Sequence, residues 1–308
     1  MKKFVKLLME LYCGSKVIKM LTVLFPSDYF EPNKPDESFI SEYRAALENH
    51  INVILLSYDA FLEDGKLQLK GNISTEYPVI YRGWMLKPEK YAELFHKLLN
   101  MDLRLITSPQ DYKRMHSFPE IYPELLEDTA QMLVYDDSEK IDYEQIRKAF
   151  NKCVVKDFVK SVKGTDFPKC ISTDIREDEF RRLIRKFLSY RGNLYTGGIC
   201  IKEFLELKRY SEKTNEYRVF YCNNQAVTIS RNSGQPEYLP EPPEALIEKY
   251  SVLNSPFYTI DYAEISDGTW KIIEAGDGQV SGLSDFQDAI NFYKILLLVF
   301  GKIESGGS

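Results

Sequence analysis

The sequence predicts an α/β unit from Met20 to about residue 108, followed by an α+β unit that extends to about residue 300. Two observations support this fold class. In the first unit, short apolar runs alternate with helical patterns, which is typical of a mostly parallel sheet covered by helices. In the second unit, most strands are joined by tight turns, which is typical of antiparallel sheets. At 308 residues, the chain is long enough to bury a core in each unit.

The first unit should contain four strands and two helices. The apolar runs "MLTVLF", "NVILLS", "PVIYRGW" and "LRLIT" predict strands at 20–25, 52–57, 78–84 and 103–107, and helical patterns cover 37–49 and 88–100. Ligands bind at the carboxyl ends of strands in such sheets. Arg82 lies at one of these ends and is therefore predicted to contact a substrate, the alternative being a surface arginine that covers an aromatic ring.

The flanking segments of this unit are expected to be simpler. Residues 1–19 read as an appended amphipathic helix, and residues 109–131, with their proline-broken turns, as a connection to the second unit. Residues 301–308, which include "ESGGS", read as a flexible tail.

The second unit begins with the predicted strand "QMLVYD" and a helix at 142–150. The segment "CVVKDFVKSVKG" follows, and then a strand within 197–207. A hairpin is expected at 216–232, turning at Asn223-Asn224, and a second one is formed by strands at 257–265 and 269–276.

The composition excludes several classes of protein. Apolar residues make up 44% and charged residues 28%, which is ordinary for a folded globular chain. A net charge of -6 gives no overall attraction to nucleic acid or anionic membranes, and no secretory core or membrane span is evident. Five dispersed cysteines without a CxxC pair favour a reducing, cytoplasmic setting, and three histidines give little support for a zinc site.

Asp261 and Glu274 lie on the two strands of one predicted hairpin, which turns near Asp267-Gly268. Counting back from the turn places the two carboxylates nearly opposite each other. Like charges that face each other across a ladder repel, so a cation is expected between them. Magnesium is held in this way, by one or two carboxylates together with phosphates and water. Alternatively, one carboxylate points to solvent or pairs with Lys271.

Three glycines follow this pair closely, at Gly276, Gly278 and Gly282. They are expected to leave room for phosphates and substrate beside the metal, and to permit positive φ in a tight turn.

Lys156 lies within an apolar strand, where a lone ammonium group is costly to bury, so it requires an anionic partner. Lys160, Ser161, Lys163 and Gly164 follow in a loop that could close over phosphate with its cations and backbone N–H groups. For Lys160 and Lys163, an edge strand whose lysines reach solvent is the competing interpretation.

Two further segments suit a ligand site. The extended "IKEFLEL" suits a hinge that presents backbone groups of residues 203–205 to a flat aromatic ligand. The hairpin "NEYRVFY…AVTISRN" carries Glu216, Arg218 and Arg231. Alternation puts the first two on one face, where they can form an ion pair, and arginine is also well shaped to clamp phosphate or carboxylate.

Taken in order, these features resemble the ATP-grasp superfamily. The phrases "LFPSDYF", "YRGW", "VVKDFVKSVKG", "EYRVF" and "IDYAEISDGTWKIIEAGDGQVSG" are similar to its clade named for two arginines and a lysine. The resemblance covers Met20 to about Phe300. It implies an ATP-grasp domain at 132–300, whose two α+β lobes grip ATP, preceded by a small α/β pre-ATP-grasp domain at 20–108.

The resemblance also implies a role for each matched residue. The nucleotide contacts are Lys156 at the phosphates, Glu203, Phe204 and Leu205 at the adenine edge, and Glu216 near the ribose. The catalytic residues are Arg218 and Arg231 at the phosphate and acyl-phosphate end. Lys160 is added to them because the loop pattern described above places its cation near phosphate. The metal ligands are Asp261 and Glu274.

Two departures from the superfamily pattern stand out. The loop after Lys156 has one glycine and several cations where many members are glycine-rich. Gly276 occupies a position where many members carry an asparagine near the metal, so Asp277, also a candidate substrate contact, or Gln279 is predicted to supply the missing oxygen.

The activity that the resemblance implies is an ATP- and Mg²⁺-dependent carboxylate–amine ligase acting on a peptide or amino acid through an acyl phosphate. The alternatives are a nucleotide-binding regulatory module, or pseudoenzyme, and an ATP-dependent phosphotransferase. The expected partners are a small molecule or peptide with a carboxylate and an amine acceptor, with no nucleic acid and no membrane. The sequence is silent on oligomeric state.

Overall fold

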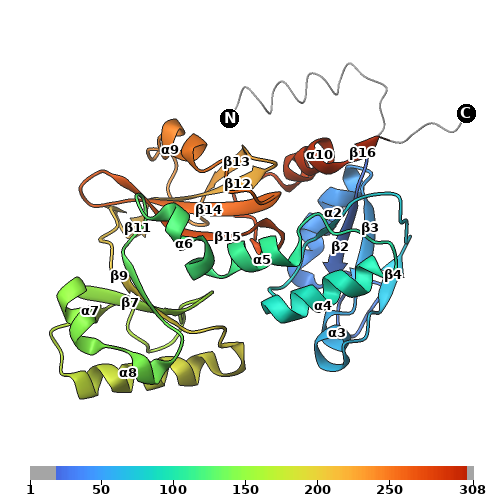
Figure 1. Cartoon of the computed structure of the whole chain (residues 1–308). Coiled ribbons are helices and arrows are strands. Elements are labelled where there is room, and N and C mark those ends of the chain that lie inside the picture. Colours follow the sequence, from blue (N-terminus) through green and yellow to red (C-terminus); the bar gives the residue numbers. More distant parts are fainter. Residues whose placement is uncertain (1–18, 304–308) are drawn as a thin grey trace, which may run out of the picture.

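The computed structural model describes residues 19–303, which form three four-stranded sheets with helices packed around them (Figure 1). The first domain contains the sheet of order β4-β3-β2-β5. Its strands are β2 (Thr22–Pro26), β3 (Asn52–Leu56), β4 (Leu69–Gly71) and β5 (Val79–Tyr81). β2 runs parallel to both β3 and β5, which confirms the mostly parallel sheet, and only β4 is antiparallel.

The helices of the first domain are η1 (Glu37–Phe39), α2 (Ile40–Glu48), α3 (Tyr58–Asp64) and α4 (Pro88–Leu99). The two predicted helices are thus confirmed, whereas α3 and β4 lie in a stretch that showed only a polar pattern. The strand predicted at 103–107 is wrong, because Leu105 makes a single isolated bridge to Val79.

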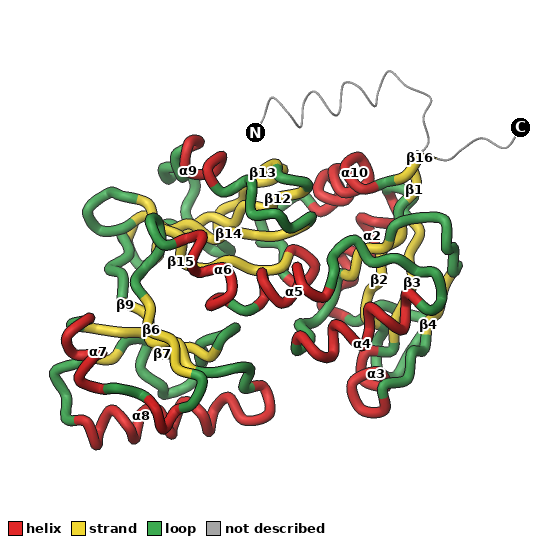
Figure 2. The backbone as a smooth tube through the Cα atoms, viewed as in Figure 1, coloured by secondary structure: helices red, strands yellow, loops and turns green. Residues whose placement is uncertain are grey.

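The connection consists of two short helices, α5 (Pro109–His116) and α6 (Phe118–Leu125), as the prolines predicted. Both pack along strand β15 of the sheet that follows. Figure 2 shows α5 and α6 in red between the first domain and the rest of the chain.

A smaller lobe follows, with the sheet order β6-β9-β7-β8. Its strands are β6 (Met132–Tyr135), β7 (Lys152–Asp157), β8 (Ile171–Ser172) and β9 (Ile199–Glu203). Its helices are η2 (Ser138–Lys140), α7 (Tyr143–Ala149), α8 (Glu177–Arg191) and η3 (Gly192–Leu194). Helix α8, missing from the sequence-based prediction, buries Phe180, Ile184 and Phe187 along one face.

The central sheet is antiparallel, with the order β13-β12-β14-β15. Its strands are β12 (Glu216–Cys222), β13 (Gln225–Arg231), β14 (Phe257–Glu264) and β15 (Trp270–Asp277). The other elements here are the hairpin β10 (Arg209–Tyr210) and β11 (Lys213–Thr214), and the helices α9 (Glu244–Lys249), η4 (Gly278–Val280) and α10 (Ala289–Phe300). Asn223 and Asn224 both have positive φ, which confirms the predicted turn.

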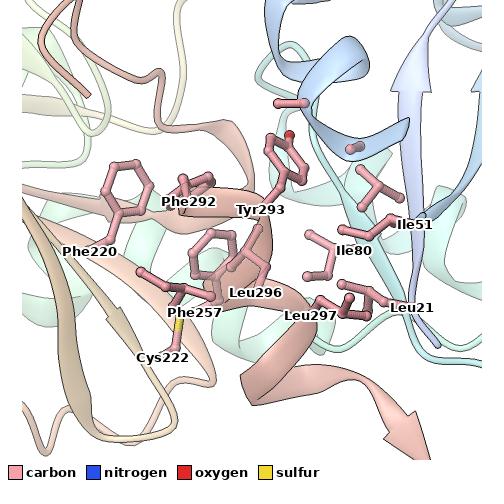
Figure 3. Close-up of a cluster of buried hydrophobic side chains, with 14 of the residues drawn as sticks. Leu21, Ile51, Ile80, Phe220, Cys222, Phe257, Phe292, Tyr293, Leu296 and Leu297 are labelled. Carbon is pink, nitrogen blue, oxygen red and sulfur yellow. The ribbon is translucent and has the colours of Figure 1, made fainter. Parts of the chain in front are cut away.

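Helix α10 joins the first domain to the central sheet. Its buried residues Phe292 and Leu296 belong to one core cluster with Leu21 and Ile80 of the first domain and Phe220 of β12 (Figure 3). The first domain and the central sheet therefore share a hydrophobic core.

The chain ends of the described part pair with each other. β1 (Lys19–Met20) and β16 (Lys302–Ile303) form a short antiparallel ladder, so the tail expected from residue 301 begins with ordered strand. The helix predicted for the N-terminal extension lies outside the described residues, apart from Lys19. Within 19–303, helices capable of crossing a membrane are absent, since none is both long and apolar enough.

Candidate active site

Three charged side chains lie side by side on one face of the central sheet. The strand register pairs Arg218 of β12 with Asp261 of β14, and Asp261 with Glu274 of β15. Directly paired residues share a face of a sheet. The two carboxylates thus stand opposite each other, as the hairpin arithmetic predicted.

Each carboxylate is neutralised by its own cation. Arg218 forms a two-pronged ion pair with Asp261, with Nε–Oδ1 and Nη2–Oδ2 distances of 2.8 and 2.7 Å. The Lys156 ammonium lies 3.3 Å from Glu274 Oε1, which supplies the anionic partner that a strand lysine required. The alternative of a pair with Lys271 is wrong, because that ammonium donates to a backbone carbonyl oxygen elsewhere.

The pKa values follow from this pairing. Burial alone would raise the pKa of Glu274, but the nearby cations, chiefly Lys156 and Lys160, lower it to about 2. Burial alone would lower the pKa of Arg218, but Asp261 raises it above its usual value. Glu274 is therefore ionised and Arg218 charged throughout the physiological range.

The loop after β7 is shaped by Asp157, which the sequence analysis did not single out. Its Oδ1 accepts hydrogen bonds from the N–H groups of Val159 and Lys160, and its Oδ2 from Arg191 Nε. This arrangement turns the chain so that the Lys160 ammonium lies 4.0 Å from Glu274 Oε1. An aspartate side chain that accepts a hydrogen bond from the N–H two residues later forms an Asx turn. An aspartate at the end of a predicted strand is therefore a local turn signal.

Lys202 on β9 is, after Asp157, a second residue near the site that the sequence analysis did not single out. It is only 6% exposed, donates to the Ile273 carbonyl oxygen at 3.0 Å, and places Nζ 4.1 Å from the centre of the Phe118 ring. Burial, with a smaller contribution from Lys156, lowers the pKa of its ammonium to about 7. Lys156 and Lys202 therefore face the same aromatic ring, which also lies 5.7 Å from Lys156 Nζ.

A pocket of about 100 Å³ opens beside these charges. Its lining combines residues of the first domain, helix α5, the loop after β7, the central sheet and the loop after β15. Those that bear on its chemistry are Met85, His116, Lys160, Arg218, Asp261 and Glu274.

The two carboxylates suit a magnesium ion that is shared with phosphate. Asp261 and Glu274 face each other across a ladder, and Glu274 is ionised. Among residues 19–303, no group of three or more acidic, histidine or cysteine side chains is placed to hold a metal. Two carboxylates completed by phosphate oxygens and water match the usual magnesium site.

Comparison with known proteins identifies the family. Residues 113–296 match the family described as "ATP-grasp domain, R2K clade family 3". The chain belongs to the R2K clade of the ATP-grasp superfamily. A search of curated proteins found no significant match.

Solved structures agree with this assignment. The ATP-grasp ligase PsnB complexed with a minimal precursor has a TM-score of 0.58 at 11% identity, over 91% of this chain and 99% of that one. D-cycloserine synthetase DcsG has a TM-score of 0.57 at 13% identity, over 90% and 98%. D-alanyl-alanine synthetase A from Vibrio cholerae has a TM-score of 0.56 at 10% identity, over 91% and 98%. This similarity shows a shared ATP-grasp fold.

The hinge expected at the adenine edge of an ATP-grasp site lies at the end of β9. The N–H groups of Glu203 and Phe204 already donate to the carbonyl oxygens of Gln131 and Lys152. The N–H of Leu205 is not engaged by any described part of the chain. Of the three hinge residues, Leu205 therefore keeps a backbone donor for a ligand.

Glu216, which is predicted to lie near the ribose, has its carboxylate held by two hydrogen bonds. Glu216 accepts hydrogen bonds from the Thr214 hydroxyl and from Asn232 Nδ2. The predicted alternative of an ion pair between Glu216 and Arg218 is wrong, since Arg218 pairs with Asp261.

Arg231 does not join the pocket. The register pairs it with Tyr217 and pairs Arg218 with Ser230, so the two arginines start from opposite faces of the sheet. Its guanidinium is 3.1 Å from Glu237 and lies 3.7 Å from the centre of the Phe286 ring. The prediction that both arginines meet at the phosphate end is therefore not matched by the geometry.

Arg82 is a correction to the predicted substrate contacts. Its side chain is 1% exposed, and its donors bind both Glu42 oxygens and the carbonyl oxygens of Gly278 and Ser281. Glu42 also accepts from the Tyr293 hydroxyl. Arg82 thus fastens the loop after β15 to the first domain instead of meeting a ligand.

Asp277 and Gln279 are a second correction. Asp277 is fully buried, and alternation along β15 places it on the face opposite Glu274. Gln279 donates to the Tyr91 hydroxyl and to Asp277 Oδ1, and accepts from the N–H of Tyr81. Gln279 is therefore engaged within the protein. Asp277 keeps an unpartnered Oδ2 and is among the residues that line the pocket, but it lies on the face away from Glu274, so neither side chain is placed to replace the missing asparagine at the metal position.

The glycines after Glu274 do not have the positive φ that was predicted for a tight turn. Gly276, Gly278 and Gly282 are absent from the positive-φ glycines of the described chain. A Cβ at Gly278 would lie 2.6 Å from the Phe257 ring, and one at Gly276 would lie 3.3 Å from Ser281 Oγ. Packing within the protein therefore accounts for Gly278, whereas Gly276 and Gly282 line the pocket, where the predicted need for room stays a prediction.

Proposed function

We propose that the protein is an ATP- and Mg²⁺-dependent carboxylate–amine ligase that acts through an acyl-phosphate intermediate on a peptide or amino acid. One observation carries the proposal. Two opposed carboxylates, each held by a cation, line a pocket together with Lys160. Membership of the ATP-grasp superfamily and its ligase-like fold support the same conclusion.

The nucleotide would lie between the two lobes of the ATP-grasp domain. In this proposal the Leu205 N–H meets the adenine edge, and Glu216 meets the ribose. Lys156 reaches the phosphates, since its strand ends beside the metal carboxylates. PsnB structures with Mg and ADP show that an ATP-grasp ligase of this fold holds both.

Asp261 and Glu274 would hold magnesium jointly with the phosphates. Once anionic phosphate is present, Lys156 and Arg218 can exchange part of their contact with the carboxylates for contact with phosphate oxygens. In the nucleotide-free protein, the two ion pairs would keep the carboxylates oriented and compensate the buried charges. Bound Mg·ATP supplies the phosphoryl group that activates the substrate carboxylate.

The protein's own residues supply positioning and charge. Lys160 and Arg218 would draw the substrate carboxylate toward the terminal phosphate and neutralise the charge that develops there. An amine then attacks the acyl phosphate, forming an amide and releasing phosphate. The position of Arg231 outside the pocket gives it no direct part in this step.

Two alternatives keep some support. The cation-rich loop after Lys156 and the buried positions of Asp277 and Gln279 favour a nucleotide-binding regulatory module. A phosphotransferase would use the same phosphate contacts and stop at phosphorylation of its substrate. Both predict ATP binding without amide formation.

Product analysis separates these possibilities. The protein is incubated with ATP, magnesium and pooled amino acids or peptides, and release of ADP and phosphate is measured together with the masses of new products. The ligase account expects amide products in step with phosphate release. Loss of turnover is expected in the Asp261→Asn, Glu274→Gln double variant, but not in Lys271→Met, whose lysine lies on β15 away from the pocket. ADP release without any amide would favour a phosphotransferase, and binding without turnover a regulatory module.

A further inference from the structure

His116, the last residue of helix α5, presents its imidazole to the pocket. The side chain is 7% exposed and shares the pocket wall with Lys160 and Glu274. Its ring stacks on Tyr112, with centroids 4.8 Å apart and an angle of 19° between the ring planes. Stacking fixes one face of the ring, so its nitrogen atoms at the edge are held in a defined direction.

The imidazole has no hydrogen-bond partner within residues 19–303. Its ring nitrogens are not among the buried unpartnered polar atoms of the described chain, so they stay open to the pocket that His116 lines. Tyr112, on which the His116 ring stacks, differs in this respect. Its hydroxyl forms hydrogen bonds with both the N–H and the carbonyl oxygen of Leu86. An unpartnered imidazole that lines a pocket therefore points to a ligand.

The surroundings of His116 define the charge of that ligand. Burial and the nearby Lys160 ammonium lower the pKa of His116 to about 4, while Glu274 raises it slightly. The ring is therefore neutral near pH 7, with one N–H donor and one acceptor nitrogen. A cationic group would be repelled by Lys160, whereas an anionic oxygen can bind both the ammonium and the imidazole N–H.

We propose that His116 is a ligand-contacting residue that donates a hydrogen bond to an oxygen of the terminal phosphoryl group of bound ATP. The inference rests on the proposed function, because it places that group beside Lys160 and Glu274. No proton transfer is required, since a neutral imidazole donates its N–H and keeps it.

The histidine content of the chain makes a direct test possible. Only three histidines exist, His50, His96 and His116, and the first two are exposed on the first domain. Ring ¹⁵N signals of the full chain are recorded by NMR with magnesium and either ADP or a non-hydrolysable ATP analogue. We expect the His116 signals to shift with the analogue and much less with ADP, while those of His50 and His96 stay in place. Equal shifts with both nucleotides, or none despite binding, would overturn the inference.

Three variants give an independent measurement. His116→Phe keeps the aromatic stack but loses the hydrogen bond, His116→Gln can restore a donor, and His96→Gln is the surface control. We expect His116→Phe to bind the analogue about tenfold more weakly and ADP within twofold of the wild type, because a hydrogen bond to a charged group is lost. His116→Gln should recover most of the loss. An unchanged ratio of analogue to ADP affinity in His116→Phe would refute the contact, whereas failure of the wild type to bind any nucleotide would refute the proposed function itself.

Discussion

Lys202 carries a buried charge whose cost to folding is measurable. Burial lowers the pKa of its ammonium to about 7, so the folded state binds fewer protons than the unfolded chain between about pH 7 and pH 10.5. The contribution of this group to stability therefore rises with pH across that window. Charges are retained in such places when function requires them, and here the ammonium lies near Lys156 and Glu274.

We expect Lys202→Met to raise the free energy of unfolding at pH 7 by about 1–2 kcal/mol, because a buried charge is replaced by an apolar chain of similar length. The gain should shrink toward pH 10. Urea unfolding measures the first effect, and calorimetric titration with an ATP analogue should show weaker binding. A variant that is less stable than the wild type at pH 7 would contradict this account, and Lys271→Met is the matched control.

Asp277 should make stability fall as pH rises. Burial raises the pKa of its carboxyl group from 3.8 to about 7, and its Oδ2 has no partner in the described chain. Between about pH 4 and pH 7 the folded state binds the extra proton, so deprotonation costs stability. Asp277→Asn should remove this slope, on the order of 1–4 kcal/mol between pH 4 and pH 8. Parallel unfolding curves for wild type and variant at both pH values would count against it.

Sequence alone predicts the residues whose placement follows from local pattern. Asp261 and Glu274 were paired by counting from a turn, and the need of Lys156 for an anion followed from its apolar strand. Arg82 and Asp277 could not be placed, because their burial depends on helices and loops distant in the chain. His116 lacked a signal for the same reason, since its pocket is built from five other segments.

At the scale of elements, the loop after β15 depends on close packing at one glycine. A Cβ at Gly278 would lie 2.6 Å from the Phe257 ring, whereas one at Gly282 would have no atom within 4 Å. The same loop presents the Gly282 carbonyl oxygen to Arg218 at 2.9 Å, so its position bears on the site.

Gly278→Ala should therefore destabilise the fold by about 1–3 kcal/mol through overpacking. Gly282→Ala is the matched control and should stay within about 0.5 kcal/mol of the wild type. Thermal or urea unfolding of the two variants distinguishes them. Equal stability of the two would show that the ring of Phe257 moves freely out of the way.

Elements were predicted well where the pattern was strong and local. The hairpin at Asn223-Asn224 and the helix at 88–100 were correct because turn residues and periodicity mark them. Helix α8 was not predicted. Its sequence nevertheless carries a helix signal, because the apolar residues Phe180, Ile184 and Phe187 recur at helical spacing among charged residues. The run at 103–107 has strand composition but makes only the single bridge from Leu105 to Val79, which is too short to count as a strand.

At the scale of the whole molecule, Arg82 and Glu42 fasten the first domain to the loop after β15. The guanidinium bonds Glu42 of α2 and two carbonyl oxygens after β15, and Tyr293 of α10 completes the group. Four segments from the two domains thus meet at one buried ion pair. The first domain is therefore part of the site's framework.

Arg82→Met should lower the free energy of unfolding by about 3–5 kcal/mol, because Glu42 is left buried without its cation. The Arg82→Met, Glu42→Met double variant should be less destabilised than the single one, since no charge is stranded. Denaturant unfolding of these two variants and of the Glu42→Met single variant gives the comparison. A double variant that loses the sum of the two single losses would argue against a coupled pair.

The central claim is that Asp261 and Glu274 bind magnesium together with ATP, and calorimetric titration of a non-hydrolysable ATP analogue tests it most directly. With magnesium, the wild type should bind at least tenfold more tightly than without it, while the Asp261→Asn, Glu274→Gln double variant should show no such gain. Absence of binding by the wild type, or an equal magnesium effect in the double variant, would contradict the account.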